Sequence, residues 1–148
     1  MPRKNFFESK FWRPIMKATN QIKVDRKTKD KTHAITQALN ILKQGDLFGI
    51  FPEGTRSRTG QLQKAYTGVA KLVLKAKVPI IPVGITGTYE ILSAHDKFPK
   101  LKKCQFKIAQ PIYLDKYYGQ EDDKEVLRKI TDDLMKQIGE MVGEEYKW

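Results

Sequence analysis

The sequence predicts an α/β fold in which helices pack against a mainly parallel sheet. Short apolar runs alternate with amphipathic helical stripes along the chain, and this order is typical of crossover connections between parallel strands. The chain has 148 residues, enough to bury a hydrophobic core without disulfides. No internal repeat or Gly/Ser-rich linker divides the sequence, so we expect one domain over residues 1–148.

The first part of the pattern predicts two helices and two strands. Aromatic and apolar pairs recur at helical spacing between basic residues over residues 6–17, which predicts an amphipathic basic helix, and residues 20–24 are expected as a short strand. A helical apolar stripe over residues 34–42 stops at Gly45, a residue suited to the left-handed position past a helix end. The apolar run of residues 47–51 predicts a buried strand before Pro52.

The second part predicts a helix, two strands and a final helix. Apolar residues at helical spacing over residues 65–76 predict a second such helix, which must end before Pro79. Residues 80–85 predict another buried strand, in which Pro82 indicates an edge or a bulge, and residues 105–109 alternate as a third. An apolar stripe over residues 127–141 predicts the last helix. Ligands of such sheets bind at the carboxyl ends of the strands, which directs attention to the residues after Phe51.

The charge, cysteine content and apolar runs of the sequence exclude several classes of protein. There are 28 Lys+Arg against 17 Asp+Glu, and the basic excess lies mainly in residues 1–31, with 10 basic and 3 acidic side chains, and residues 61–110, with 9 and 2. Such surfaces attract nucleic acid, anionic lipid or phosphorylated substrates, unless the lysines only add solubility. One cysteine excludes an internal disulfide and a cysteine-based zinc module. No apolar run approaches the roughly 18–20 residues of a transmembrane helix, so we expect a protein that is neither spanning nor secreted.

The loop of residues 52–60 is the candidate site. It combines one carboxylate, two guanidinium groups, three hydroxyls and two glycines in a strand-to-helix connection. Arginine matches phosphate bidentately, hydroxyls and backbone N–H groups complete such a cage, and Glu53 can orient an arginine or a substrate hydroxyl. The alternative is a polar loop in which Glu53 and Arg56 only pair with each other. The spacing of Gly54 and Gly60 matches no nucleotide-binding glycine motif.

The residues of this loop also resemble a known family. Residues 51–57, Phe-Pro-Glu-Gly-Thr-Arg-Ser, resemble residue for residue the third signature block of the glycerolipid acyltransferases typified by 1-acylglycerol-3-phosphate O-acyltransferase. Residues 22–26 are similar to the second block and residues 78–85 to the fourth, in the same order. The resemblance extends from about residue 4 to residue 109 and implies a glycerol-3-phosphate acyltransferase-like α/β fold that is truncated at its N-terminus.

The resemblance implies an enzyme of phospholipid biosynthesis. Such an enzyme moves a fatty acyl group from acyl-CoA or acyl carrier protein, as co-substrate, to the free hydroxyl of 1-acylglycerol-3-phosphate, with no further cofactor and no metal. Pro79 and Pro82 match the block that is linked to the acyl-donor side or to packing. The resemblance assigns the substrate phosphate to the residues that match its second and third blocks: Arg26, Glu53, Gly54, Thr55, Arg56 and Ser57.

The catalytic block of this family, Asn-His-x-x-x-x-Asp, has no counterpart in the sequence. Five residues after His33 and His95 stand Ala38 and Lys100 instead of aspartate. We expect His33 at the surface or as a helix cap, His95 as a polar loop residue and Cys104 as a half-buried structural residue, so no catalytic residue is identified. Three explanations stay open: a fragment, a split gene whose upstream companion segment carries the block, or a remnant that binds without catalysing.

The expected partners are a lysophospholipid, an acyl donor and an anionic membrane surface, and not nucleic acid. The basic aromatic residues 6–17 have the composition of an interfacial helix, although their apolar stripe is equally suited to packing on the sheet. We expect a cytoplasmic protein, peripheral on the inner face of the membrane, with little activity alone. The alternative function is a non-catalytic remnant that binds phospholipid at a membrane surface.

Overall fold

The computed structural model describes residues 22, 32–93, 95–96 and 98–148 of the chain. The chain divides into two compact units, Met1–Gly49 and Ile50–Trp148, and each is described by itself. The helix expected over residues 6–17 lies outside the described residues, as does the strand expected over residues 20–24 apart from Ile22. The single domain expected over residues 1–148 stays a prediction.

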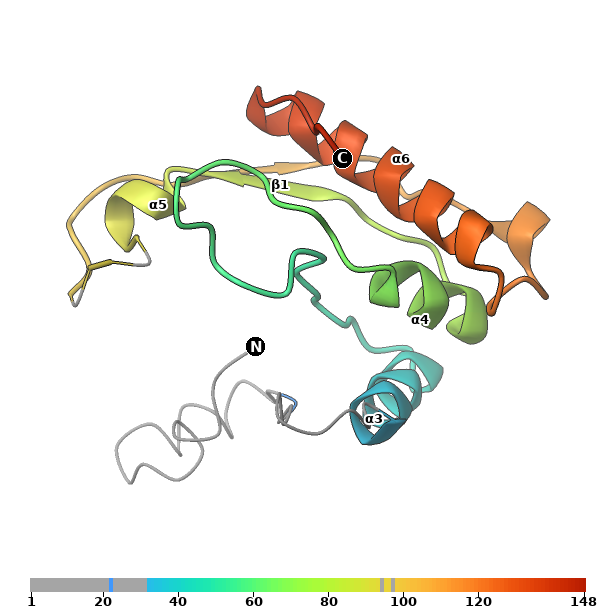
Figure 1. Ribbon diagram of the computed structural model, residues 1–148. Coiled ribbons are helices and arrows are strands. Elements are labelled where there is room, and N and C mark those ends of the chain that lie inside the picture. Colours follow the sequence, from blue (N-terminus) through green and yellow to red (C-terminus); the bar gives the residue numbers. More distant parts are fainter. Residues whose placement is uncertain (1–21, 23–31, 94, 97) are drawn as a thin grey trace. The chain divides into compact units, whose positions relative to one another are not determined.

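Helix α3, Thr32–Lys43, is the described element of the first unit (Figure 1). It confirms the helix expected over residues 34–42, and Ala38 of the apolar stripe is buried. The helix ends as expected, because Gly45 follows it with a φ of 81°, in the left-handed region that glycine enters without steric cost. The sequence pattern therefore located both the helix and its end.

The expected buried strand over residues 47–51 is wrong. Leu47 is 90% exposed and Phe51 68% exposed, and the segment belongs to neither strand of the described residues. A strand needs a neighbour to take up its backbone N–H and C=O groups. In the described part of the chain the two strands pair with each other, so an apolar run alone does not make this segment a strand.

The sheet of the second unit has two antiparallel strands, β1 (Val83–Thr86) and β2 (Gln105–Ile108). Val83 lies opposite Ile108 and Thr86 opposite Gln105, so the expected mainly parallel sheet is not what these strands form. The connection explains the direction, because a parallel pair needs a long crossover, whereas the chain here returns through the short helix α5, Thr88–Ile91, and a loop. β1 begins after Pro82, which has no N–H to donate to a ladder.

Two longer helices complete the second unit. Helix α4, Gly68–Ala76, and helix α6, Lys124–Val142, confirm the helices expected over residues 65–76 and 127–141, although α4 begins later than expected. Figure 1 shows α6 lying along β1 and α4, and these are the elements that α6 contacts most. The short 3-10 helix η1, Asp115–Tyr117, precedes α6.

The hydrophobic core lies between α4 and α6. Its buried side chains come from both helices, from Ile80 before β1 and from Leu114 before η1, and each large one contributes about 1.5–3 kcal/mol by leaving water. Gly84 lets α6 approach β1, because a Cβ there would lie 3.0 Å from Met141 Cβ and from Val142 Cγ1. The core cluster consists of Val69, Ala70, Val73, Leu74, Ile80, Leu114, Leu127, Ile130 and Leu134.

The sheet has one covered and one exposed face. Gly84 of β1 is buried under α6, whereas Val83 is exposed, and Phe106 and Ile108 of β2 are 62% and 73% exposed. The strand expected over residues 80–85 forms over Val83–Thr86, and it is buried on one face only, since a single helix layer covers it. No helix in the described part of the chain is long and apolar enough to cross a membrane.

Candidate functional site

Gly54 makes the first turn of the loop of residues 52–60. Its φ is 68°, and its N–H donates to the Phe51 carbonyl oxygen over 3.0 Å. The Tyr66 ring lies against it, so a Cβ at Gly54 would stand 3.1 Å from Tyr66 Cε2, and the Tyr66 N–H donates to the Pro52 carbonyl oxygen over 2.9 Å. Both the backbone angle and the close ring therefore require glycine here.

The Glu53 carboxylate ties the start of the same loop to the segment that leads into α4. Its Oε2 accepts a hydrogen bond from the Gln63 N–H over 2.8 Å. Burial raises the pKa of Glu53; the Gln63 hydrogen bond opposes this shift, and the nearby charge of Glu144 adds to it. None of the ion pairs among the described residues joins Glu53 to Arg56, so the alternative in which the two only pair with each other does not hold.

Arg56 and Arg58 attach the middle of the loop to the segment around α5. Arg56 Nη1 donates to the Ser93 carbonyl oxygen over 3.4 Å, and the Tyr89 hydroxyl donates to the Arg58 carbonyl oxygen over 3.1 Å. Both arginine side chains are exposed. A guanidinium carries five N–H donors, so the contact to Ser93 leaves Arg56 with donors for an anion.

One hydroxyl of the loop faces solvent, and two contact each other within the loop. Thr55 is exposed, whereas Ser57 Oγ lies 3.4 Å from Thr59 Oγ1 and accepts the Thr59 N–H over 3.3 Å. Gly60 then turns the chain with a φ of 86° against the Tyr89 ring. The result is a loop with a fixed backbone that presents guanidinium groups and a hydroxyl outward, an arrangement that suits a phosphate.

Five of the six expected phosphate residues lie together in one loop. Residues 53–57 share the loop, whereas Arg26 lies outside the described residues. Pro79 is exposed after α4, and no hydrogen bond in the described part of the chain joins Pro79 or Pro82 to the loop. The Pro82 carbonyl oxygen accepts the Ala109 N–H over 3.0 Å, which agrees with packing; its acyl-donor role stays a prediction.

The histidines lie where the sequence places them, and the cysteine does not. His33 is exposed on α3, and His95 is exposed in the turn after α5, where its backbone N–H donates to Ser93 Oγ. Neither imidazole has a carboxylate partner among the described residues. Cys104 is exposed rather than half-buried, because it precedes β2, a strand whose four residues are all exposed.

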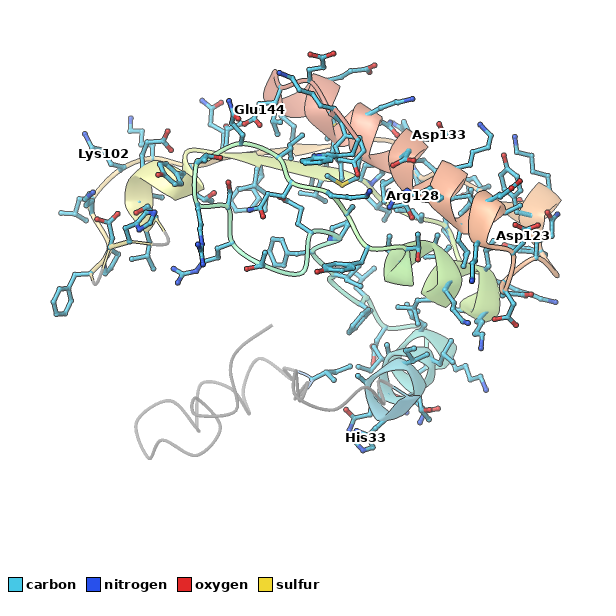
Figure 2. All side chains as sticks on the ribbon, viewed as in Figure 1. His33, Lys102, Asp123, Arg128, Asp133 and Glu144 are labelled. Atoms are coloured by element: carbon cyan, nitrogen blue, oxygen red, sulfur yellow. The ribbon has the colours of Figure 1, made fainter. Side chains whose placement is uncertain are left out.

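Sequence reasoning missed the residues that hold the loop. Gln63, Tyr66, Tyr89 and Ser93 each contact it, and Glu144 adds a second carboxylate nearby, whose Oε2 accepts the Leu62 N–H over 2.7 Å. Figure 2 shows Glu144 just beyond the end of α6. Most of these contacts join residues far apart in the sequence, and no local pattern signals them. No group of three or more His, Cys, Asp or Glu in the described residues could hold a metal ion.

Comparison with known proteins identifies relatives that are named as 1-acyl-sn-glycerol-3-phosphate acyltransferases. The 1-acyl-sn-glycerol-3-phosphate acyltransferase of Bacillus subtilis is 26% identical over 141 residues, which cover 95% of this chain and 67% of that protein. The probable 1-acyl-sn-glycerol-3-phosphate acyltransferase of Mycoplasma pneumoniae is 31% identical over 87 residues, which cover 58% of this chain and 33% of that protein. The chain thus spans between a third and two thirds of these relatives.

A solved structure shares the fold. The crystal structure of the 1-acyl-sn-glycerophosphate (LPA) acyltransferase from Thermotoga maritima superposes with a TM-score of 0.74 at 24% identity, covering 99% of this chain and 57% of that one. This likeness confirms an acyltransferase-like α/β fold. The acyltransferase family model matches residues 1–86, which include all three segments that resemble signature blocks. The chain belongs to the acyltransferase family.

Proposed function

We propose that the chain belongs to a 1-acylglycerol-3-phosphate acyltransferase of phospholipid biosynthesis and holds the phosphate of its acceptor lipid. One observation carries the proposal: the loop of residues 52–60 is fixed on both sides, yet the Arg56 and Arg58 side chains and the Thr55 hydroxyl are exposed. Such a loop can bind a phosphate without rearranging. Arg26 is the expected additional ligand, and the names of the relatives support a glycerol phosphate as the acceptor.

The proposed reaction is acyl transfer from a thioester to an alcohol. The free hydroxyl of 1-acylglycerol-3-phosphate attacks the thioester carbonyl of acyl-CoA or acyl carrier protein while a base takes the hydroxyl proton. A C–O bond forms, the C–S bond breaks, and the thiolate leaves and receives that proton to become the free thiol. The loop contributes orientation, because a phosphate held by Arg56 fixes the position of the hydroxyl; orientation and proximity can supply about 7–11 kcal/mol in well-aligned systems. No cofactor beyond the acyl donor is proposed.

Glu53 acts in this proposal as a positioning residue. Its hydrogen bond to the Gln63 N–H ties the start of the loop to the segment that leads into α4. Since Gly54 to Ser57 follow directly, a displaced Glu53 would move the phosphate ligands together.

The second candidate is a non-catalytic module that binds phospholipid at a membrane surface. It is favoured by one observation: neither His33 nor His95 has a carboxylate partner among the described residues. For the enzyme, we propose little turnover by this chain alone, with the base supplied by an upstream companion segment; the binding module needs no base. In either case the proposed location is cytoplasmic, on the inner face of an anionic membrane.

The phosphate site is tested by titrating glycerol 3-phosphate, and a short-chain 1-acylglycerol-3-phosphate below its micelle concentration, into the 148-residue chain. Arg56→Gln removes charge-assisted hydrogen bonds of about 1.5–3 kcal/mol, so we expect affinity to fall at least about tenfold. Lys136→Gln on α6 makes the same charge change away from the loop and should leave affinity unaltered. Equal affinities for Arg56→Gln and wild type would refute the site, and DNA binding with a steep salt slope in its place would favour a nucleic-acid protein.

Turnover separates the two candidates. The chain is assayed with 1-acylglycerol-3-phosphate and either acyl-CoA or acyl carrier protein, alone and with an added segment that carries Asn-His-x-x-x-x-Asp. Activity that appears only with the added segment supports the enzyme. Lipid binding without turnover in both mixtures supports the binding module, and rapid transfer by the chain alone would contradict the proposed need for an external base.

A further inference from the structure

The segment between α5 and β2 exposes apolar side chains among lysines. Phe98 is 81% exposed and Leu101 is fully exposed, and the lysines at 100, 102 and 103 are exposed as well. We call residues 98–103 the lysine–apolar loop. Single exposed apolar side chains are common on protein surfaces, but two that are almost fully exposed within four residues, among three exposed lysines, form a patch that suits contact with something other than water.

The lysine–apolar loop is held in place by its own hydrogen bonds. The Lys100 N–H donates to the Ile91 carbonyl oxygen over 2.8 Å, and the Lys102 N–H donates to the Lys100 carbonyl oxygen over 2.9 Å. Lys100 Nζ pairs with Asp96 over 3.0 Å, whereas no ion pair in the described residues uses Lys102 or Lys103. Two uncompensated cations therefore flank apolar side chains on a fixed backbone.

This chemistry fits an anionic lipid interface better than a protein partner. Apolar side chains enter the boundary between headgroups and acyl chains, while lysines reach the anionic headgroups with their charged ends. Each lysine near such a surface strengthens binding about fivefold. An acidic protein surface would pair with the lysines but would leave Phe98 and Leu101 without apolar contact.

The loop also lies close to the candidate phosphate site. Ile91 accepts the Lys100 N–H at the end of α5, and Ser93, two residues later, accepts the Arg56 hydrogen bond. Figures 1 and 2 show α5 and Lys102 at the same end of the second unit. A lipid that stays in a membrane keeps its phosphate at the interface, so a contact here would bring that phosphate toward Arg56.

We propose that residues 98–103 dock the chain on an anionic lipid bilayer, with Phe98 and Leu101 inserted and Lys102 and Lys103 on the headgroups. The inference rests on the proposed function in one respect: the membrane is where the proposed acceptor lipid would be found. It assigns lipid contact to a segment separate from the basic aromatic residues 6–17. Binding to vesicles can be measured without any substrate, so the two proposals fail independently.

Sedimentation with vesicles of phosphatidylglycerol and phosphatidylcholine, and of phosphatidylcholine alone, tests the proposal on the 148-residue chain. We expect wild type to bind the anionic vesicles, and Phe98→Ser/Leu101→Ser and Lys102→Glu/Lys103→Glu each to reduce partitioning at least about tenfold. Tyr113→Ser, at a side chain 67% exposed, and Lys136→Glu/Lys147→Glu are the matched controls and should bind within about twofold of wild type. Urea midpoints of all variants exclude unfolding as the cause of a loss.

A fluorescent side chain tests insertion directly. Leu101→Trp in a Trp12→Phe/Trp148→Phe background carries one tryptophan, whose emission should shift to the blue on anionic vesicles, whereas Tyr113→Trp in the same background should not shift. Unchanged binding by both loop variants, or loss of binding only with Phe11→Ser/Trp12→Ser, would overturn the proposal. Failure of wild type to bind any vesicle would overturn it too, whatever the result with Arg56→Gln and glycerol phosphate.

Discussion

Single residues decide the shape of the phosphate loop, and Gly54 does so most directly. Its left-handed φ of 68° and the Tyr66 ring beside it both act against any side chain. We expect Gly54→Ala to lower the free energy of unfolding by about 1–2 kcal/mol, measured by urea denaturation. Gly68→Ala is the control, because Gly68 begins α4 with no atom near its absent Cβ; that change should stabilise by about 0.5–1 kcal/mol. Equal effects of the two would contradict the loop geometry.

The titration of Glu53 gives a second prediction at this scale. Its pKa in the folded protein is raised above the ordinary 4.5, so its contribution to stability is present below pH 4.5 and is lost as pH rises through the folded-state pKa. Glu53→Gln removes the titration and keeps an acceptor for the Gln63 N–H. We expect the variant to gain stability relative to wild type between pH 3.5 and pH 7.

Urea unfolding of both proteins across that pH range measures the difference. Asp96 and Asp122, whose pKa values are lowered by hydrogen bonds, to Ser93 and Lys71 respectively, titrate alike in both proteins and cancel. A constant difference between the two proteins would show that burial does not raise the pKa of Glu53.

The sequence predicts the position of the phosphate loop but not the residues that contact it and fix its conformation. The run from Phe51 to Ser57 is contiguous, so the sequence itself displays its chemistry. The contact of Arg56 with Ser93 spans 37 residues and that of Tyr89 with Arg58 spans 31, and such contacts exist only after the chain has folded. The exposure of Cys104 is hard to predict for a related reason, because it depends on what covers β2.

At the scale of elements, the helices were predictable because their signals are local. The apolar stripe of α6 is buried, and Asp123 caps its start by accepting the N–H groups of Glu125 and Val126 over 2.9 and 3.1 Å. The strands were harder, because pairing is not local: residues 47–51 are apolar yet unpaired in the described part of the chain, and β1 and β2 pair antiparallel.

The cap of α6 gives a prediction for this element. Asp123→Ala leaves two backbone N–H groups without their acceptor and should cost about 0.5–2 kcal/mol of the free energy of unfolding. Asp133→Ala, on the exposed side of the same helix, removes only an ion pair with Lys129 and should cost at most about 0.5 kcal/mol. Figure 2 shows Asp123 at the start of α6 and Asp133 along it. Thermal or urea unfolding of the two variants measures the difference. Equal losses in the free energy of unfolding would contradict the capping role of Asp123.

At the scale of the whole molecule, stability and lipid contact are assigned to different leucines. Leu74 is fully buried between α4 and α6, whereas Leu101 is fully exposed in the lysine–apolar loop. We expect Leu74→Ala to lower the free energy of unfolding by about 2–5 kcal/mol and Leu101→Ala to change it by at most about 0.5 kcal/mol. Circular dichroism against urea provides the measurement. A large loss with Leu101→Ala would mean that this side chain is covered in solution.

The attachments of the phosphate loop also bear on the thermodynamics of binding. The loop is tied through the backbone carbonyls of Pro52 and Arg58 and through the side chains of Glu53 and Arg56. Their partners are Tyr66, Tyr89, Gln63 and Ser93 respectively. The conformational entropy that a mobile loop would lose on capturing a ligand is therefore already lost when the chain folds. Calorimetry of glycerol 3-phosphate binding should accordingly show a smaller entropic penalty in wild type than in Tyr89→Phe, whose loop has one attachment fewer.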